Sequence, residues 1–153
     1  GPGEAKYRSL ILSVDGCFYC PPCNAPQVLC IDPVMLDAEF IGPEFCQGGY
    51  KWVTAVLGDD GNVYSPPWCA HKSLRIDVED RWAKQIGPDQ RWGGGKWEAV
   101  YPHEDGFYYC PPLCATDILS IDTVVGCVDL LKPDMGKDSR KWRCAGRSPI
   151  GEL

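Results

Sequence analysis

The chain has 153 residues, a hydrophobic content of 44% and a formal net charge of −6, so it is long enough for one well-buried domain. The acidic balance and the scattered basic residues argue against nucleic-acid binding, which needs clustered lysines and arginines. No apolar run approaches the roughly 20 residues that a membrane span requires, so the sequence predicts no span, and it shows no signal peptide.

A repeat of 45 residues organises the chain. Its units start at Lys6, Lys51, Lys96 and Lys141, each followed by Tyr or Trp. We divide the predicted single domain, 1–153, into repeat 1 (6–50), repeat 2 (51–95), repeat 3 (96–140) and a partial fourth unit or closing strand (141–153). A period in this range indicates an architecture in which each unit is one supersecondary element.

Repeat 2 shows the predicted elements most clearly. Short strands are expected over residues 51–57, 62–65, 73–78 and 81–86. Asp60-Gly61 favours a tight hairpin between the first two strands, and Pro66-Pro67 ends the second because proline cannot donate to a central ladder. The third strand alternates apolar and polar residues with a period of two. Helical periodicity is absent, so the predicted class is all-β, with four short strands in each of three repeats.

Aspartate recurs at two positions of every repeat, and we call each set of equivalent positions in the three repeats a column. The two columns comprise Asp15, Asp60 and Asp105 before a glycine, and Asp32, Asp77 and Asp122 at the end of the third strand. A calcium site needs several oxygens that converge on one point, whereas these residues recur in separate turns. We therefore interpret both columns as turn-forming, because aspartate side chains bond the backbone that follows them.

The repeated pattern Gly-x-x-Tyr-x-Pro-Pro, a loop, then Leu-x-Ile-Asp resembles kelch-like and YVTN-type β-propeller repeats. The resemblance extends from Lys6 to about Leu131. It implies that each unit is a four-stranded, propeller-like blade. Three blades are fewer than the four to eight of a closed propeller, so closure of the ring stays open. A β-trefoil, a threefold barrel of similar length, is the alternative fold.

Ten cysteines predict disulfides and an oxidising compartment. The disulfide candidates are Cys20, Cys30, Cys69, Cys110, Cys114, Cys127 and Cys144. Cys20 and Cys30 are expected in neighbouring strands, which favours a cross-strand pair. A metal or iron–sulfur site at Cys17, Cys20, Cys23 and Cys30 is the weaker alternative, because two prolines separate two of these thiols. No other cofactor is expected.

Residues that break the repeat are the candidates for function, since one site needs one set of groups. The candidate partner contacts are Trp68, Trp82, Trp92, His71 and His103. An exposed tryptophan that is not repeated suits a protein partner or a sugar. Each histidine could act as a general base, but neither has a nucleophile with an orienting partner beside it. No catalytic residue is therefore predicted.

The predicted function is that of a non-enzymatic repeat scaffold that binds a macromolecular partner. One specific version is an accessory luminal subunit of a large membrane complex such as an algal photosystem. The compartment is then the thylakoid lumen, or the protein is secreted. The alternatives are a lectin-like, carbohydrate-binding module and a propeller hydrolase or lyase.

Overall fold

The computed structural model describes residues 5–46, 48–132, 136 and 140–142. Within these residues twelve strands form three separate antiparallel sheets of four strands, which we call blades 1 to 3. Blade 1 contains β1 (Ile11–Leu12), β2 (Phe18–Cys20), β3 (Val28–Asp32) and β4 (Asp37–Ile41). Blade 2 contains β5 (Val56–Leu57), β6 (Val63–Ser65), β7 (Ser73–Asp77) and β8 (Trp82–Ile86). Blade 3 contains β9 (Tyr101–Pro102), β10 (Phe107–Cys110), β11 (Ile118–Asp122) and β12 (Cys127–Leu131).

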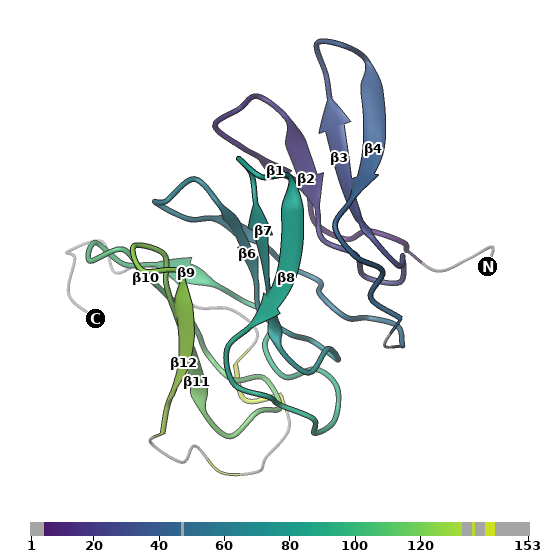
Figure 1. Ribbon diagram of the computed structural model, residues 1–153. Helices are drawn as coiled ribbons and strands as arrows, with labels where there is room; N and C mark the ends of the chain where they lie inside the picture. The colour runs from purple at the N-terminus through teal and green to yellow at the C-terminus, as the bar shows by residue number, and fades with distance from the viewer. Residues whose placement is uncertain (1–4, 47, 133–135, 137–139, 143–153) are drawn as a thin grey trace.

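Each repeat forms one blade, and the blades lie side by side as sectors of a propeller-like arc (Figure 1). The strands of each sheet follow chain order, so every connection inside a blade is a hairpin. The all-β, propeller-like prediction is confirmed. The β-trefoil alternative is wrong, because the repeats pair their strands into three separate sheets rather than one barrel. Among the described residues no helix is long and apolar enough to cross a membrane.

Two hydrophobic clusters hold the arc together. The first joins blades 1 and 2 and includes Tyr19, Trp52 and Ile76. The second joins blades 2 and 3 and includes Tyr64 and Trp97. Each blade thus has a front face, toward the preceding blade, and a back face, toward the following one, because successive side chains of a strand point to opposite sides.

The first strand of each blade is shorter than predicted. Residues 51–57 were expected to form one strand, but β5 covers only Val56–Leu57. The residues before it serve the junction between blades instead. The Lys51 N–H donates to the carbonyl of Cys23 in the preceding repeat at 3.0 Å. Trp52 packs in the first cluster, and its indole donates to the carbonyl of Lys72 in its own repeat at 3.0 Å.

The lysines that start repeats 2 and 3 are part of the fold rather than of the surface. Lys51 is 1% exposed and Lys96 is 4% exposed. The Lys51 ammonium donates to the carbonyl of Ala25 at 2.8 Å, and that of Lys96 donates to the carbonyl of Gly93 at 3.3 Å. Burial lowers the pKa of both amines. These lysines therefore bond the junctions between blades, which composition alone does not reveal.

Candidate functional site: the turn face

The hairpin turns of all three blades lie at one end of the molecule, which we call the turn face. It consists of residues 13–17, 33–36, 58–62, 78–81, 103–106 and 123–126. The loops that contain the proline pairs and the linkers between blades lie at the opposite end, the loop face. In Figure 1 the hairpins of blade 1 point upward, and the linkers run along the lower side.

The repeated aspartates build these turns. Asp15 accepts a hydrogen bond from the Cys17 N–H at 3.0 Å, and Asp32 accepts from Val34 and Met35 at 2.8 and 2.9 Å. Asp60 and Asp122 make the corresponding bonds in their own blades. The carboxylates satisfy local backbone donors, as the interpretation of these columns as turns requires.

Hydrogen bonds between blades fix the turns relative to one another. The Asp59 N–H donates to the Thr123 hydroxyl at 3.1 Å, and this hydroxyl donates to the carbonyl of Gly106 at 2.9 Å. The Tyr108 hydroxyl donates to the carbonyl of Leu57 at 2.7 Å. The turns of blades 2 and 3 therefore form one surface rather than independent hairpin tips.

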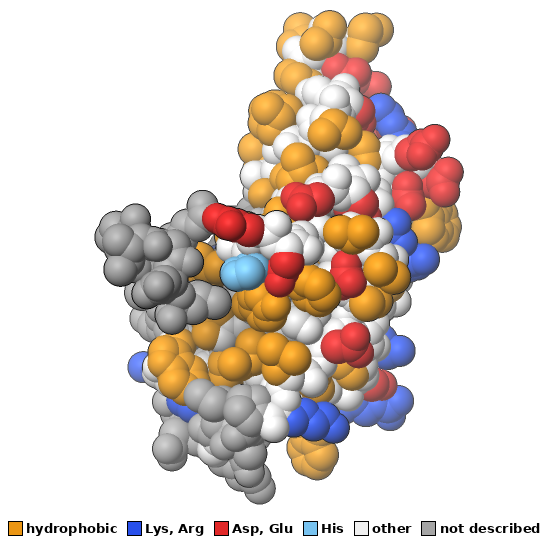
Figure 2. Space-filling view, turned by 90° about the vertical axis from the view of Figure 1, so that its left-hand side faces the viewer, with side chains coloured by type: hydrophobic (Ala, Val, Ile, Leu, Met, Phe, Trp, Pro, Cys, Tyr) orange, Lys and Arg blue, Asp and Glu red, His pale blue; other side chains and the backbone are white. Residues whose placement is uncertain are grey.

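Large apolar side chains stand exposed at the tips of these turns. Their exposed fractions are at least 70%, and the residues are Val14, Val34, Met35, Leu36, Val124 and Val125. Acidic residues of the same turns, Asp59, Glu79 and Asp80 among them, lie between these tips. Figure 2 shows acidic side chains interspersed with apolar ones over this part of the molecule, and apolar side chains at its summit, on the β3–β4 hairpin. Exposed apolar groups gathered in this way mark interaction surfaces.

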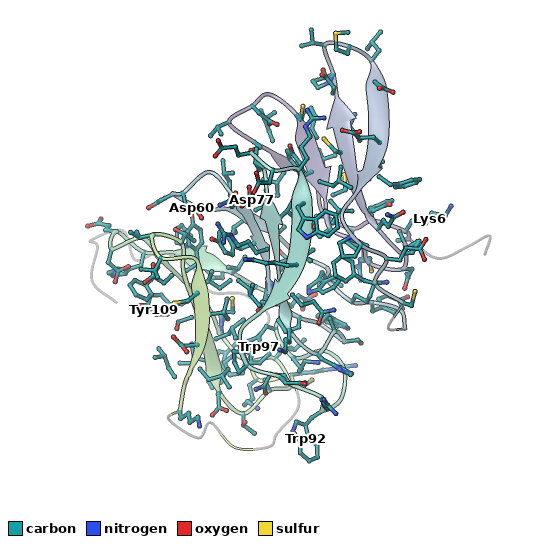
Figure 3. All side chains as sticks on the ribbon, viewed as in Figure 1. Lys6, Asp60, Asp77, Trp92, Trp97 and Tyr109 are labelled. Carbon is teal, nitrogen blue, oxygen red and sulfur yellow. The ribbon has the colours of Figure 1, made fainter. Side chains whose placement is uncertain are left out.

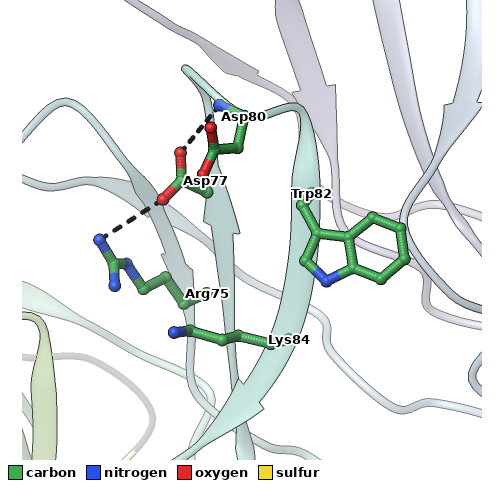
Figure 4. Close-up of a pocket in the computed structure, with 5 residues that line it drawn as sticks. All are labelled: Arg75, Asp77, Asp80, Trp82 and Lys84. Carbon is green, nitrogen blue, oxygen red and sulfur yellow. Dashed lines mark hydrogen bonds and ion pairs between the residues drawn. The ribbon is translucent and has the colours of Figure 1, made fainter.

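An open groove of about 380 Å³ lies on the back face of blade 2. Its lining residues are Arg75, Asp77, Asp80, Trp82 and Lys84 (Figure 4). They come from β7, β8 and the turn between them. Only Asp77 is shared by all three repeats; the other four lining positions carry different residues in repeats 1 and 3. Trp82 is 53% exposed and offers an aromatic surface.

The equivalent groove on blade 1 is smaller, about 220 Å³, and its lining includes Cys30, Asp32, Met35, Asp37 and Glu39. Arg81 of blade 2 also lines it and pairs with Glu39. Gly126 of blade 3 occupies the repeat position of Arg81. Since glycine has no side chain to extend, the groove on blade 2 stays open where the one on blade 1 is partly filled.

The groove on blade 2 has hydrogen-bond donors to spare. Arg75 lies 3.7 Å from both Asp60 and Asp77, and its Nε–H is buried without an acceptor. Within the described chain, Lys84 forms no ion pair within 4.0 Å. Asp60 and Asp77 lie close together at the turn end of blade 2 (Figure 3) and also line an adjoining hollow of about 600 Å³. The two hollows hold cationic side chains beside several carboxylates, so they suit a polar ligand that carries both hydrogen-bond acceptors and donors.

The five predicted contact residues separate into two groups. His103 belongs to the turn face, where its Nδ1 is 2.9 Å from Asp105 Oδ1, and Trp82 is the first residue of β8, directly after the turn at 78–81. Trp68, His71 and Trp92 belong to the loop face. Trp92 is 82% exposed and points away from the blades (Figure 3). The two histidines are thus at opposite ends, and neither lines the grooves on blades 1 and 2.

The sequence analysis did not identify Arg75, Asp80 and Lys84 as candidate contact residues, although the repeat contains a signal for them. Each stands in a column where the other repeats have residues of different chemistry, such as Cys30 and Ser120 opposite Arg75. Comparing columns for changes of charge, rather than for tryptophan and histidine alone, would have found them.

The cysteines that the structure describes are free thiols. The expected disulfide between Cys20 and Cys30 is not formed, because Cys30 pairs across the sheet with Tyr19, whereas Cys20 pairs with Leu29. Neighbouring residues of a strand point to opposite faces, so Cys20 and Cys30 lie on opposite sides of blade 1. Cys69, Cys110, Cys114 and Cys127 are likewise free. Cys144 lies outside the described residues.

The same separation bears on the metal alternative. Cys17 and Cys30 belong to the back face of blade 1 and pack in the first cluster, whereas Cys20 points to the front. No group of three or more histidine, cysteine, aspartate or glutamate side chains among the described residues could hold a metal ion. The four thiols at Cys17, Cys20, Cys23 and Cys30 are therefore not gathered as a ligand set.

We expect the buried thiols to make the fold sensitive to alkali. Burial raises the pKa of Cys17, Cys20, Cys23 and Cys110. For Cys20 the pKa rises from 9.0 to about 11. A group with a raised folded pKa contributes stability that is complete below its unfolded pKa and is lost as pH rises through the folded one. Buried tyrosines such as Tyr64 act in the same sense at higher pH, and together these groups outnumber the opposing Lys51 and Lys96.

The free energy of unfolding, measured by urea denaturation under reducing conditions, should therefore fall between about pH 9 and pH 11. A Cys20→Ala variant should lose less stability over the same interval than the unmodified chain. A free energy that stays level over this range would contradict the burial of these thiols.

Known structures share this fold at low sequence identity. No protein-family model and no curated protein matches the sequence. A virginiamycin B lyase from Staphylococcus aureus, crystallised in an inactive form with quinupristin, is 14% identical over 90% of this chain and 45% of its own, with a TM-score of 0.67. The extracellular domain of a putative hybrid two-component system from B. thetaiotaomicron is 12% identical over 93% of this chain and 18% of its own, with a TM-score of 0.67.

An auxiliary nutrient-binding protein from Bacteroides thetaiotaomicron is 14% identical over 89% of this chain and 34% of its own, with a TM-score of 0.55. At these identities the likeness concerns the fold alone, which is β-propeller-like in each case. The chain spans less than half the length of the lyases that it matches. The comparisons thus establish a propeller-like fold for this chain, and the activities that they name are properties of the other proteins.

Proposed function

We propose that this protein is a non-enzymatic binding module whose turn face docks a polypeptide partner. The observation that carries the proposal is the set of exposed apolar tips at one end of the molecule, among them Val34, Leu36 and Val124. Hydrogen bonds fix the turns of blades 2 and 3 to one another at this end. A soluble surface has no structural need for such a concentration of apolar groups. The interspersed carboxylates favour a partner that also carries lysine or arginine.

The groove on blade 2 adds a specific pocket to this surface. Trp82 offers an aromatic contact, and the Arg75 and Lys84 side chains that line the groove offer donors to a partner side chain with acceptor oxygens. Binding rather than catalysis is favoured because His71 and His103 lie at opposite ends and neither lines this groove. The likeness to kelch-like and YVTN-type repeats also agrees with a scaffold. Extracellular and nutrient-binding domains among the structural neighbours support a location outside the cytoplasm.

A displayed library of random linear peptides, selected on the purified chain, tests the proposal. We expect the bound peptides to be enriched in apolar and basic residues. Replacing Val34, Met35, Val124 and Val125 by serine together should weaken their binding at least about tenfold, which corresponds to about 1.4 kcal/mol. Trp82→Ala should weaken those peptides that reach the groove. Binding should also decrease as salt rises, because exposed charges are screened.

Trp92→Ala is the matched control, since Trp92 is a more exposed tryptophan at the opposite end and its loss should leave peptide binding unchanged. Equal affinity of the selected peptides for the tip variant would contradict the proposal. So would a glycan array in which the tightest ligands are saccharides that require Trp82 but not the apolar tips. That result would favour the lectin-like alternative.

A further inference from the structure

The front face of blade 1 carries the residues of a blade interface without a blade against it. Its apolar side chains are Phe18, Leu29, Ile31, Ala38 and Phe40. The columns of the first four, Phe18, Leu29, Ile31 and Ala38, are apolar in all repeats. The residues of these columns in blades 2 and 3 are at most 8% exposed. In blade 1 the same columns are half-buried or exposed, and Phe40 is 64% exposed.

The back face of blade 3 is the complementary half of the same interface. Phe107, Tyr109, Ile118 and Leu131 stand in the columns of Cys17, Tyr19, Val28 and Ile41, which blade 1 buries against blade 2. Tyr19 is 0% exposed and Ile41 is 5% exposed, whereas Leu131 is 44% exposed. The rings of Phe107 and Tyr109 stack with centroids 6.2 Å apart. Blade 3 thus presents an ordered apolar face of the kind that accepts a following blade.

The two junctions inside the chain show how such faces dock. Side chains of one back face, such as Tyr19 and Ile41, pack on Leu74, Ile76 and Ala83 of the next front face. The first residue of the following blade then donates its N–H to the preceding loop, from Lys51 to Cys23 at 3.0 Å and from Lys96 to Trp68 at 3.2 Å. Both halves of this arrangement recur at the open ends of the arc.

We propose that two copies of this chain associate head to tail, with the front face of blade 1 in each copy against the back face of blade 3 in the other. Such an interface is heterologous, and two copies close it into a ring of six blades. The dimensions of the neighbours agree: 90% of this chain corresponds to 45% of the length of a virginiamycin B lyase, so two copies approach one such fold. The backbone N–H of Lys141 now donates to the carbonyl of Leu113 at 2.8 Å. In the ring the backbone N–H of Lys6 from the second copy would take this place, so the bond from Lys141 has to break.

Light scattering coupled to size exclusion on the full chain tests the association. The expected mass at high concentration is twice 16.9 kDa, falling toward one copy on dilution. Phe40→Lys and Leu131→Lys each place a charge on one of the two faces, and each should halve the mass. Val34→Lys is the control, since Val34 is 84% exposed on the turn face and should leave the mass unchanged. Circular dichroism shows whether each variant keeps its strands.

A mixture of the Phe40→Lys and Leu131→Lys variants tests whether the association is head to tail. The blade 1 face of the Leu131→Lys chain and the blade 3 face of the Phe40→Lys chain are both unaltered, so a mixture should regain a species of two copies that neither variant forms alone. A single-copy mass at about 100 µM would overturn the proposal. So would dissociation by Phe40→Lys together with no effect of Leu131→Lys, since that would indicate contact between two blade 1 faces.

Discussion

Replacement of Trp97 by alanine is expected to lower the free energy of unfolding by about 3–5 kcal/mol, the usual range for a buried tryptophan. Trp97 is 0% exposed and belongs to the cluster that joins blades 2 and 3, with Tyr64 and Tyr108. Its indole also donates to the carbonyl of Asp117 at 3.0 Å. The substitution therefore leaves a cavity at the junction and removes a hydrogen bond that ties the loop before β11.

Urea denaturation followed by tryptophan fluorescence and circular dichroism measures this loss. Trp92→Ala is the matched control, because Trp92 is 82% exposed and its removal should change the free energy of unfolding by no more than about 0.5 kcal/mol. Since small domains are stable by only about 5–15 kcal/mol, the Trp97 variant should be partly unfolded well below the midpoint of the control. Similar midpoints for the two variants would show that the blades do not depend on this junction.

The repeat predicts the architecture well because its constraints are local. Asp15-Gly16 and its counterparts specify tight turns, and their carboxylates bond the backbone two residues later. The Leu-x-Ile-Asp segment becomes the third strand of every blade, with the aspartate at its end. Turn chemistry and period-two alternation need no knowledge of distant contacts, so they can be interpreted directly.

The junctions between blades could not be predicted in this way. Lys51 resembles an ordinary strand residue, yet it is buried and bonded to Ala25, 26 positions earlier. Its burial depends on carbonyl oxygens that only the assembled arc brings together. The same long-range geometry shortens the predicted first strand, since residues 51–55 serve the junction instead of pairing with β6.

The number of cysteines also led to a wrong disulfide prediction, because the register of the strands decides which thiols can meet. Cys20 and Cys30 lie in adjacent strands as expected, but a difference of one position places them on opposite faces of the sheet. The groove on blade 2 likewise depends on which residues are neighbours in space. Gly126 matters there because Arg81 fills the equivalent groove one blade earlier, a relation that appears only when columns are compared in space.

Replacement of Gly42 by alanine should destabilise the junction between blades 1 and 2 more than a turn glycine would. Gly42 has a φ of +72°, and a Cβ built on it would lie 2.9 Å from the Ala83 Cβ and 3.0 Å from the Ala83 nitrogen. Left-handed backbone costs a non-glycine residue about 1–2 kcal/mol, and overpacking adds about 1–3 kcal/mol. The expected loss in the free energy of unfolding is therefore about 2–5 kcal/mol.

Gly16→Ala separates the two contributions. Gly16 has a similar φ of +84°, but a Cβ there meets nothing within 4 Å, so its variant should lose only the backbone part, about 1–2 kcal/mol. Chemical denaturation of both variants at one temperature gives the difference. Adding Ala83→Gly to Gly42→Ala should recover part of the loss, because it removes the opposing Cβ but leaves the Ala83 nitrogen in place. Equal losses for Gly42→Ala and Gly16→Ala would mean that the blades can separate slightly without cost, and the glycine would then serve its turn alone.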